Sequence, residues 1–102
     1  MAGRKMAKSK RLWKQAQRLM PGGVNSPVRA FKGVGGSPIF VQRGQGSHIW
    51  DVDGNEYIDY MCSFGTNLLG LKNPKVEAAV MEQMKNADCF TLPSDLWVPL
   101  AK

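Results

Sequence analysis

Arg29 and Ser26 lie in a segment, residues 21–33 (PGGVNSPVRAFKG), that prolines and glycines interrupt. A guanidinium presents a planar fork of N–H donors that matches a carboxylate through two parallel hydrogen bonds. A loop restrained by proline could hold this fork in one orientation, and the Ser26 hydroxyl would add a donor. The segment therefore predicts a loop that binds a small anion; the alternative is an exposed arginine in an ordinary surface loop.

A second group of polar residues, in DVDGNEYID, has the spacing of a calcium-binding loop at Asp51, Asp53 and Asn55. Gly54, however, falls too early for the sharp turn of such a loop, and Cys62 stands where the closing bidentate glutamate belongs. An Asp-Gly pair between two β-rich runs is instead typical of a tight hairpin turn. We therefore expect a hairpin here and no metal site.

The glycine-rich stretches GVGGSP and GQGSH complete neither GxGxxG nor GxxxxGK[ST], and neither follows a predicted strand and opens a helix. We expect both to be turns. His48 is the only histidine and has no recognisable nucleophile motif beside it, so it is expected to be a strand residue rather than a general base.

Basic residues are concentrated in the first half of the chain. Ten of the fourteen lysines and arginines precede Asp51, the first acidic residue. A basic half of this kind can bind nucleic acid or an anionic membrane surface through phosphate contacts. The alternative is that the basic residues of the first helix form its solvated face.

Length and cysteine content restrict the class of protein. A chain of 102 residues suffices for one small domain with a modest core. Cys62 and Cys89 lack metal-ligand spacing, which favours free thiols in a reducing compartment. The sequence contains neither a secretory signal nor an apolar run long enough to span a bilayer, so we expect a cytoplasmic protein with no membrane partner.

Four segments follow from the hydrophobic periodicity and the turn residues. They are a basic amphipathic helix (1–21), the loop that carries Arg29 (22–37), an antiparallel three-stranded meander (38–60), and a loop with two helices (61–102). Within them we expect helices at residues 8–20, from Pro74 to about Asn86, and from Ser94 or Asp95 to Lys102, and strands at residues 38–43, 47–52 and 56–60. The last helix reaches the final residue without a glycine stop, so we expect the natural chain to continue.

Residues 21–60 resemble the N-terminal region of the glutamate-1-semialdehyde aminomutase family, within the class III pyridoxal-phosphate aminotransferases of fold type I. The resemblance runs from about Leu12 to Tyr60, and NSPVRAF is its most specific motif. It implies an α+β N-terminal segment of a fold-type I PLP-dependent transferase that leads into a large domain absent from these residues. On this basis two apolar stripes are expected to pack against that domain or a second subunit: Leu12, Ala16 and Leu19, and Val76, Val80 and Met84.

The resemblance also implies roles for individual residues. Ser26, Val28 and Arg29 would contact the substrate, with Arg29 binding its carboxylate. Phe64 stands where aminomutases have a tryptophan beside substrate and cofactor, so the aromatic face is kept but the indole N–H donor is lost. No lysine stands in a recognisable Schiff-base context, so no catalytic residue is assigned and the cofactor-binding residues stay unknown.

The function implied by the resemblance is a pyridoxal 5′-phosphate-dependent isomerisation of glutamate-1-semialdehyde to 5-aminolevulinate, in tetrapyrrole synthesis. The parent enzyme would be a homodimer acting on a small amino-acid-derived substrate, and the 102 residues alone would be inactive. Three alternatives stay open. One is a class III aminotransferase acting on a different amine, and another is a basic nucleic-acid-binding module. The third is a pseudoenzyme or scaffold fragment that retains the fold without the chemistry.

Overall fold

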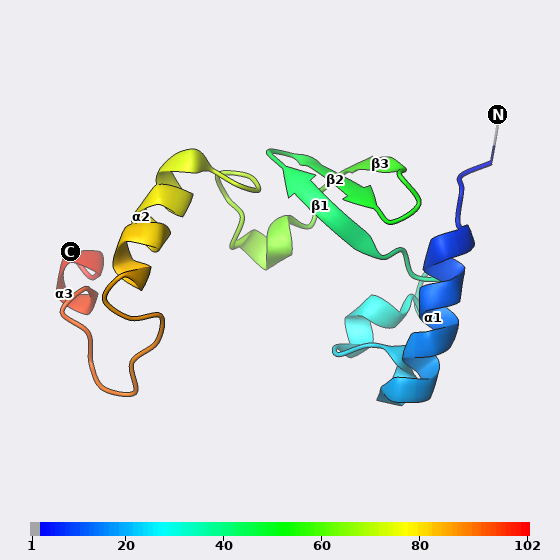
Figure 1. Cartoon of the computed structure of the whole chain (residues 1–102), viewed down its shortest axis with the longest axis horizontal. Helices are drawn as coiled ribbons and strands as arrows, with labels where there is room; N and C mark the ends of the chain where they lie inside the picture. The colour runs from blue at the N-terminus through cyan, green and yellow to red at the C-terminus, as the bar shows by residue number, and fades with distance from the viewer. Residues whose placement is uncertain (1–2) are drawn as a thin grey trace. The chain divides into compact units, whose positions relative to one another are not determined.

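The computed structural model describes residues 3–102, which form a helix, a loop, three strands, a second loop and two further helices (Figure 1). The chain divides into two compact units, the first ending at Leu71 and the second beginning at Lys72. This arrangement confirms the α+β content and the element order expected from the sequence. Within the part of the chain described, no helix is long and apolar enough to cross a lipid bilayer.

Helix α1 (Ala7–Leu19) begins and ends within one residue of its predicted bounds. Its lysines and arginines are exposed, as expected of a solvated face. Ala16, however, is only 6% exposed whereas Leu19 is 81% exposed, so the expectation of a single outward apolar stripe through Leu12, Ala16 and Leu19 is wrong at Ala16. The reason is that the chain folds back after α1 as a short 3-10 turn, η1 (Pro21–Gly23), which packs against the helix.

Gly23 makes this reversal possible. Its φ of +72° lies in the left-handed region, and a Cβ placed there would come within 2.5 Å of Trp13 Cζ3. A side chain at this position would therefore be strained in the backbone and would also collide with the indole ring. The absence of a side chain at Gly23 lets the chain turn closely under Trp13 and enter the loop that carries Arg29.

The expected antiparallel meander is present, with β1 (Val41–Gln45), β2 (His48–Asp51) and β3 (Glu56–Ile58) in the order β1-β2-β3. Strand β1 starts later than predicted and continues through residues that the sequence assigned to the turn. The reversal occurs instead after Gln45, where Gly46 has a φ of +55°. Arg43 pairs with Trp50 across β1 and β2, and its guanidinium lies 3.6 Å from the indole centroid, a cation–π contact on the hairpin.

Leu71 closes the first unit against this hairpin. Its backbone exchanges two hydrogen bonds with Gly46, both 2.8 Å long. A Cβ at Gly44 would lie 2.5 Å from Leu71 Cδ1, so Gly44 admits the leucine side chain onto the strand. Packing against residue 71 explains why a glycine occupies a strand position rather than the turn.

Asp51 is a buried polar centre of the sheet, with only 1% of the residue exposed. Its Oδ1 accepts hydrogen bonds from the backbone nitrogens of Asp53 (3.0 Å) and Asn55 (2.8 Å). Its Oδ2 accepts from Asn55 Nδ2 (2.7 Å) and Tyr57 Oη (2.8 Å). Burial by itself would raise the pKa of Asp51, but the bonds from Asn55, Tyr57 and Asp53 together hold it below its ordinary value. Both oxygens of the Asp51 carboxylate therefore accept hydrogen bonds from residues 53–57 of the same hairpin.

Asp53 connects the same turn to α1. Its two carboxylate oxygens accept hydrogen bonds from the backbone nitrogens of Lys8 (2.7 Å) and Ser9 (2.8 Å), and Asn55 Nδ2 donates to the Lys5 carbonyl (2.7 Å). Desolvation would raise the pKa of Asp53, but the bonds from Lys8 and Ser9 outweigh it and lower the pKa. Asp53, one of the residues that resembled a calcium loop, therefore caps the N-terminus of α1.

The second unit begins with α2 (Pro74–Met84), capped by Asn73, whose Oδ1 accepts from the backbone nitrogens of Lys75 (3.1 Å) and Val76 (3.3 Å). Pro74 occupies the first turn, where no N–H is needed. No residue of α2 is buried. The expected apolar stripe of Val76, Val80 and Met84 is about half exposed at each position, which leaves it open to contact with further protein.

Helix α3 (Trp97–Leu100) is shorter than the predicted helix from Ser94 or Asp95 to Lys102. Pro99 has no N–H to donate to the Asp95 carbonyl, which removes the first regular bond of a helix capped by Asp95. Ser94 Oγ instead accepts from the backbone nitrogen of Leu96 (3.3 Å) in a local turn. The expectation of a helix of about two turns is therefore wrong, and one turn remains.

Candidate functional site

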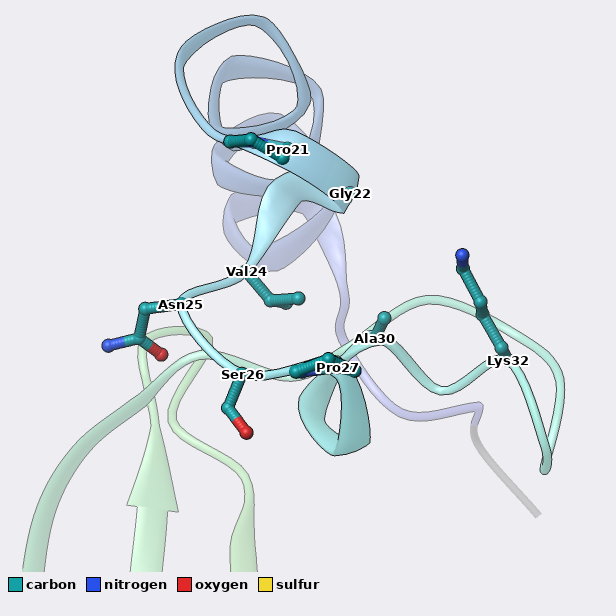
Figure 2. Close-up of a pocket in the computed structure, with 8 residues that line it drawn as sticks. All are labelled: Pro21, Gly22, Val24, Asn25, Ser26, Pro27, Ala30 and Lys32. Carbon is teal, nitrogen blue, oxygen red and sulfur yellow. The ribbon is translucent and has the colours of Figure 1, made fainter.

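A cleft of about 310 Å³ lies in the loop between α1 and the sheet (Figure 2). One side is formed where the chain leaves α1 through η1, and the other by the second 3-10 turn, η2 (Pro27–Ala30), and the residues after it. Its lining residues are Pro21, Gly22, Val24, Asn25, Ser26, Pro27, Ala30 and Lys32. Of the substrate-contacting residues expected from the sequence, Ser26 lines this cleft and is half-buried.

The backbone of the loop is restrained at both ends of η2. Ser26 is extended, Pro27 occupies the first position of the turn, and the Arg29 nitrogen donates to the Ser26 carbonyl at 3.0 Å. Phe31 ends the turn in the left-handed region at φ +57°, and its carbonyl accepts from Val34 (3.2 Å) and Gly35 (2.8 Å). The two ends of the segment NSPVRAF are therefore fixed by backbone bonds, as an anion-binding loop requires.

Arg29 is exposed, and one of its guanidinium nitrogens is held within the loop. Nη1 donates a hydrogen bond of 2.6 Å to Asn25 Oδ1. A guanidinium carries five N–H donors, so donors on Nη2 and Nε remain for a ligand. Sequence reasoning missed Asn25, although the four-residue spacing of Asn25 and Arg29 across a helical turn was the signal that could have found it.

Val28 projects from the same turn and is 69% exposed, so η2 presents an apolar side chain next to the arginine. The structure thus brings Ser26, Val28 and Arg29 together on one loop, within a single 3-10 turn and its cap. This grouping follows from the local sequence.

Phe64 lies at a different turn, η3 (Cys62–Gly65), and does not line the cleft. Cys62, Ser63 and Phe64 all have positive φ, at 45°, 50° and 58°. Left-handed backbone costs roughly 1–2 kcal/mol per non-glycine residue, and such strain clusters at functional sites. Asp59 Oδ1 supports the turn by accepting from the nitrogens of Met61 (3.0 Å) and Cys62 (3.1 Å), while the Phe64 ring is left 74% exposed.

His48 is the first residue of β2, where a strand residue was expected. Its Nδ1 lies 3.2 Å from Ser47 Oγ, its Nε2 lies 3.6 Å from Glu56 Oε1, and its ring stacks on Trp50 at 6.1 Å between centroids. Ser47 and Glu56 are exposed and the His48 side chain is 44% exposed, so these three residues lie at the surface of the hairpin and do not line the cleft. We therefore assign the contacts to cross-strand packing.

A cofactor-linked lysine needs a desolvated site beside the reacting groups. Lys72, Lys75, Lys85 and Lys102 are all exposed. The other lysines of residues 3–102 are exposed as well, so none of them has the desolvated environment that attachment of an aldehyde cofactor needs. None is assigned to that role.

The sequence and the fold of this chain are similar to those of known proteins. Residues 31–94 match the family model described as Aminotransferase class-III. The chain is 52% identical over 102 residues to a glutamate-1-semialdehyde 2,1-aminomutase of Chloroflexus aggregans, covering 100% of this chain and 23% of that protein. It is 53% identical over 95 residues to the protein of the same name from Desulforamulus reducens, covering 93% of this chain and 22% of that protein.

A solved structure agrees in fold. The PLP internal aldimine form of the FumI protein from Sphingopyxis sp. MTA144 is 39% identical, with a TM-score of 0.75, over 93% of this chain and 23% of that chain. The present chain thus spans somewhat less than a quarter of the length of the curated relatives that it matches.

Proposed function

Because this chain belongs to the class-III aminotransferase family, we propose that it is the N-terminal part of a glutamate-1-semialdehyde 2,1-aminomutase. Relatives of that name, 52–53% identical over nearly the whole chain, support the aminomutase over other class-III activities. Pyridoxal 5′-phosphate is the cofactor of the family and is bound in its solved structures. It supplies an electron-withdrawing ring that lets an amino group leave one carbon and join another.

The single observation that carries the proposal is the Arg29 guanidinium, held by the loop beside the cleft with donors left unused. In our proposal Arg29 binds the substrate carboxylate through two parallel hydrogen bonds and so fixes the orientation of the reacting carbons. The Ser26 hydroxyl adds a donor at the cleft, and Val28 adds an apolar contact to the carbon chain. Residues outside this segment would hold the cofactor, so no chemical step is assigned to the chain itself.

The proposal extends to assembly and location. The half-exposed stripe of Val76, Val80 and Met84 supports packing against the rest of a larger subunit or against a second copy in a homodimer. The parent enzyme would act in tetrapyrrole synthesis in the cytoplasm, and residues 1–102 alone would have no activity. The four segments of residues 1–21, 22–37, 38–60 and 61–102 would form the entry to the large domain.

A second candidate is a class-III aminotransferase acting on a different amine. Phe64 favours it, because the side chain presents an exposed aromatic face without the N–H donor of the tryptophan expected in an aminomutase. If a substrate oxygen requires that donor, its loss would shift preference toward substrates without the oxygen.

The experiment that tests the proposal uses a chimeric holoenzyme in which residues 1–102 replace the matching segment of the Chloroflexus aggregans aminomutase. We expect the purified chimera, loaded with pyridoxal 5′-phosphate, to form 5-aminolevulinate from glutamate-1-semialdehyde. A folded, cofactor-loaded chimera that forms none, and transaminates other amines instead, would overturn the aminomutase proposal in favour of the second candidate. Phe64→Trp in the same chimera would then be expected to restore aminomutase activity.

A further inference from the structure

Asn25 connects Arg29 to the wall of the cleft. Asn25 lines the cleft and Arg29 does not, yet Arg29 Nη1 lies 2.6 Å from Asn25 Oδ1. The bond spans the turn whose backbone is closed by the Arg29 nitrogen and the Ser26 carbonyl at 3.0 Å. The hydrogen bond therefore holds the guanidinium next to a residue that lines the cleft.

We propose that Asn25 is a positioning residue that orders Arg29 for the substrate carboxylate, an inference that rests on the proposed function. A long arginine side chain loses rotamer freedom when it binds a ligand, and that loss weakens binding. A bond to Asn25 restricts the guanidinium before the substrate arrives. Because residues 3–102 engage only Nη1, the donors on Nη2 and Nε stay available for the paired bonds to a carboxylate.

The neutral amide is the property that this role requires. An aspartate at position 25 would have nearly the same shape but would carry a negative charge against the guanidinium. It would pair with Arg29 as the substrate carboxylate does, and would compete with the substrate for the same donors. Asn25 provides an acceptor without that competition.

The test compares Asn25→Ala and Asn25→Asp with Arg29→Ala in the chimeric holoenzyme, with Asn86→Asp as a matched charge change at an exposed asparagine of the second unit. Steady-state kinetics give KM and kcat for glutamate-1-semialdehyde. Calorimetry gives the affinity for levulinate, which carries the carboxylate, and for its methyl ester, which does not.

We expect Asn25→Ala to raise KM and weaken levulinate binding by about fivefold, and Asn25→Asp to do so by about tenfold or more, the effects of a lost or diverted charge-assisted hydrogen bond. Values for kcat and for the methyl ester should stay within about twofold of the unsubstituted chimera, as should all values for Asn86→Asp.

Three outcomes would overturn the inference in distinguishable ways. If Arg29→Ala raises KM while both Asn25 variants match the unsubstituted chimera, Asn25 has no positioning role and the proposed function stands. If Arg29→Ala leaves KM unchanged, the carboxylate anchor of the proposed function fails, and the inference fails with it. An Asn25 variant that weakens levulinate and its ester equally would assign Asn25 a structural role only.

Discussion

Asp53 Oδ1 accepts a hydrogen bond of 2.7 Å from the backbone nitrogen of Lys8, which lies 45 residues earlier in the chain. The turn of a hairpin thereby caps the N-terminus of α1, whose own first turn contains no acidic residue and whose N-cap residue, Met6, provides no side-chain bond. Through α1 and η1, this cap contributes to placing the loop that carries Arg29.

We predict that Asp53→Ala will loosen the first turn of α1. Loss of a capping side chain destabilises a helix N-terminus, because backbone N–H groups lose their acceptor. Amide hydrogen exchange of Lys8 and Ser9 in the chimeric holoenzyme would measure this change locally. Asp88→Ala, at an exposed position outside both elements, is the control, and equal exchange in the two variants would contradict the capping role.

Low pH is predicted to weaken the hydrogen bonds that the Asp51 and Asp53 carboxylates accept. The folded-state pKa values of Asp51 and Asp53 are lowered from the ordinary value, so their contribution to stability is complete above the unfolded pKa of about 3.9. It is lost as pH falls through the lower, folded pKa values. We expect the free energy of unfolding to decline below about pH 4 less steeply in an Asp51→Asn, Asp53→Asn variant than in the unsubstituted protein. Equal slopes would contradict the assignment.

The stabilising contribution of Tyr57 should be lost at alkaline pH. Burial, together with the hydrogen bond to Asp51, raises the pKa of Tyr57 above its ordinary value of 10.0. Its stabilising contribution is therefore complete below pH 10 and is lost as pH rises through the folded pKa. Spectrophotometric titration of the phenols should show a component that ionises above pH 10, and Tyr57→Phe should remove that component. If Tyr57→Phe leaves the component in place, the buried hydrogen bond is not present.

Gly23 offers a prediction with an internal control. Gly22 and Gly23 both have positive φ, 67° and 72°, but only a Cβ at Gly23 meets Trp13. We predict that Gly22→Ala will cost the left-handed strain alone, about 1–2 kcal/mol, whereas Gly23→Ala will add about 1–3 kcal/mol from overpacking. Urea unfolding would measure the difference, and equal midpoints for the two variants would show that Trp13 does not pack on Gly23.

Local sequence patterns predicted most of the helices and strands, because each of these elements is marked by residues that are neighbours in sequence. The Asp53-Gly54 turn marked the hairpin, and Asn73 with Pro74 marked the start of α2. The final helix is shorter than predicted because Pro99 has no N–H to donate to the Asp95 carbonyl. The chain order of the meander also followed from its short connections.

Long-range contacts could not be predicted in the same way. Nothing near Asp53 indicates that its carboxylate reaches Lys8, and the fit of Leu71 onto Gly44 joins segments with no shared pattern. At the site, Ser26, Val28 and Arg29 were identifiable from residue type and resemblance, while the bond from Asn25 depends on rotamers that only coordinates provide.

The central claim, that Arg29 binds a substrate carboxylate, is tested most directly by the kinetics of Arg29→Ala in the chimeric holoenzyme. Arg18→Ala, at an exposed arginine of α1, is the matched control. We predict that Arg29→Ala will lower kcat/KM for glutamate-1-semialdehyde by about 10- to 100-fold, mainly by raising KM, because a charge-assisted pair is lost. A KM for Arg29→Ala equal to that of Arg18→Ala would contradict the claim.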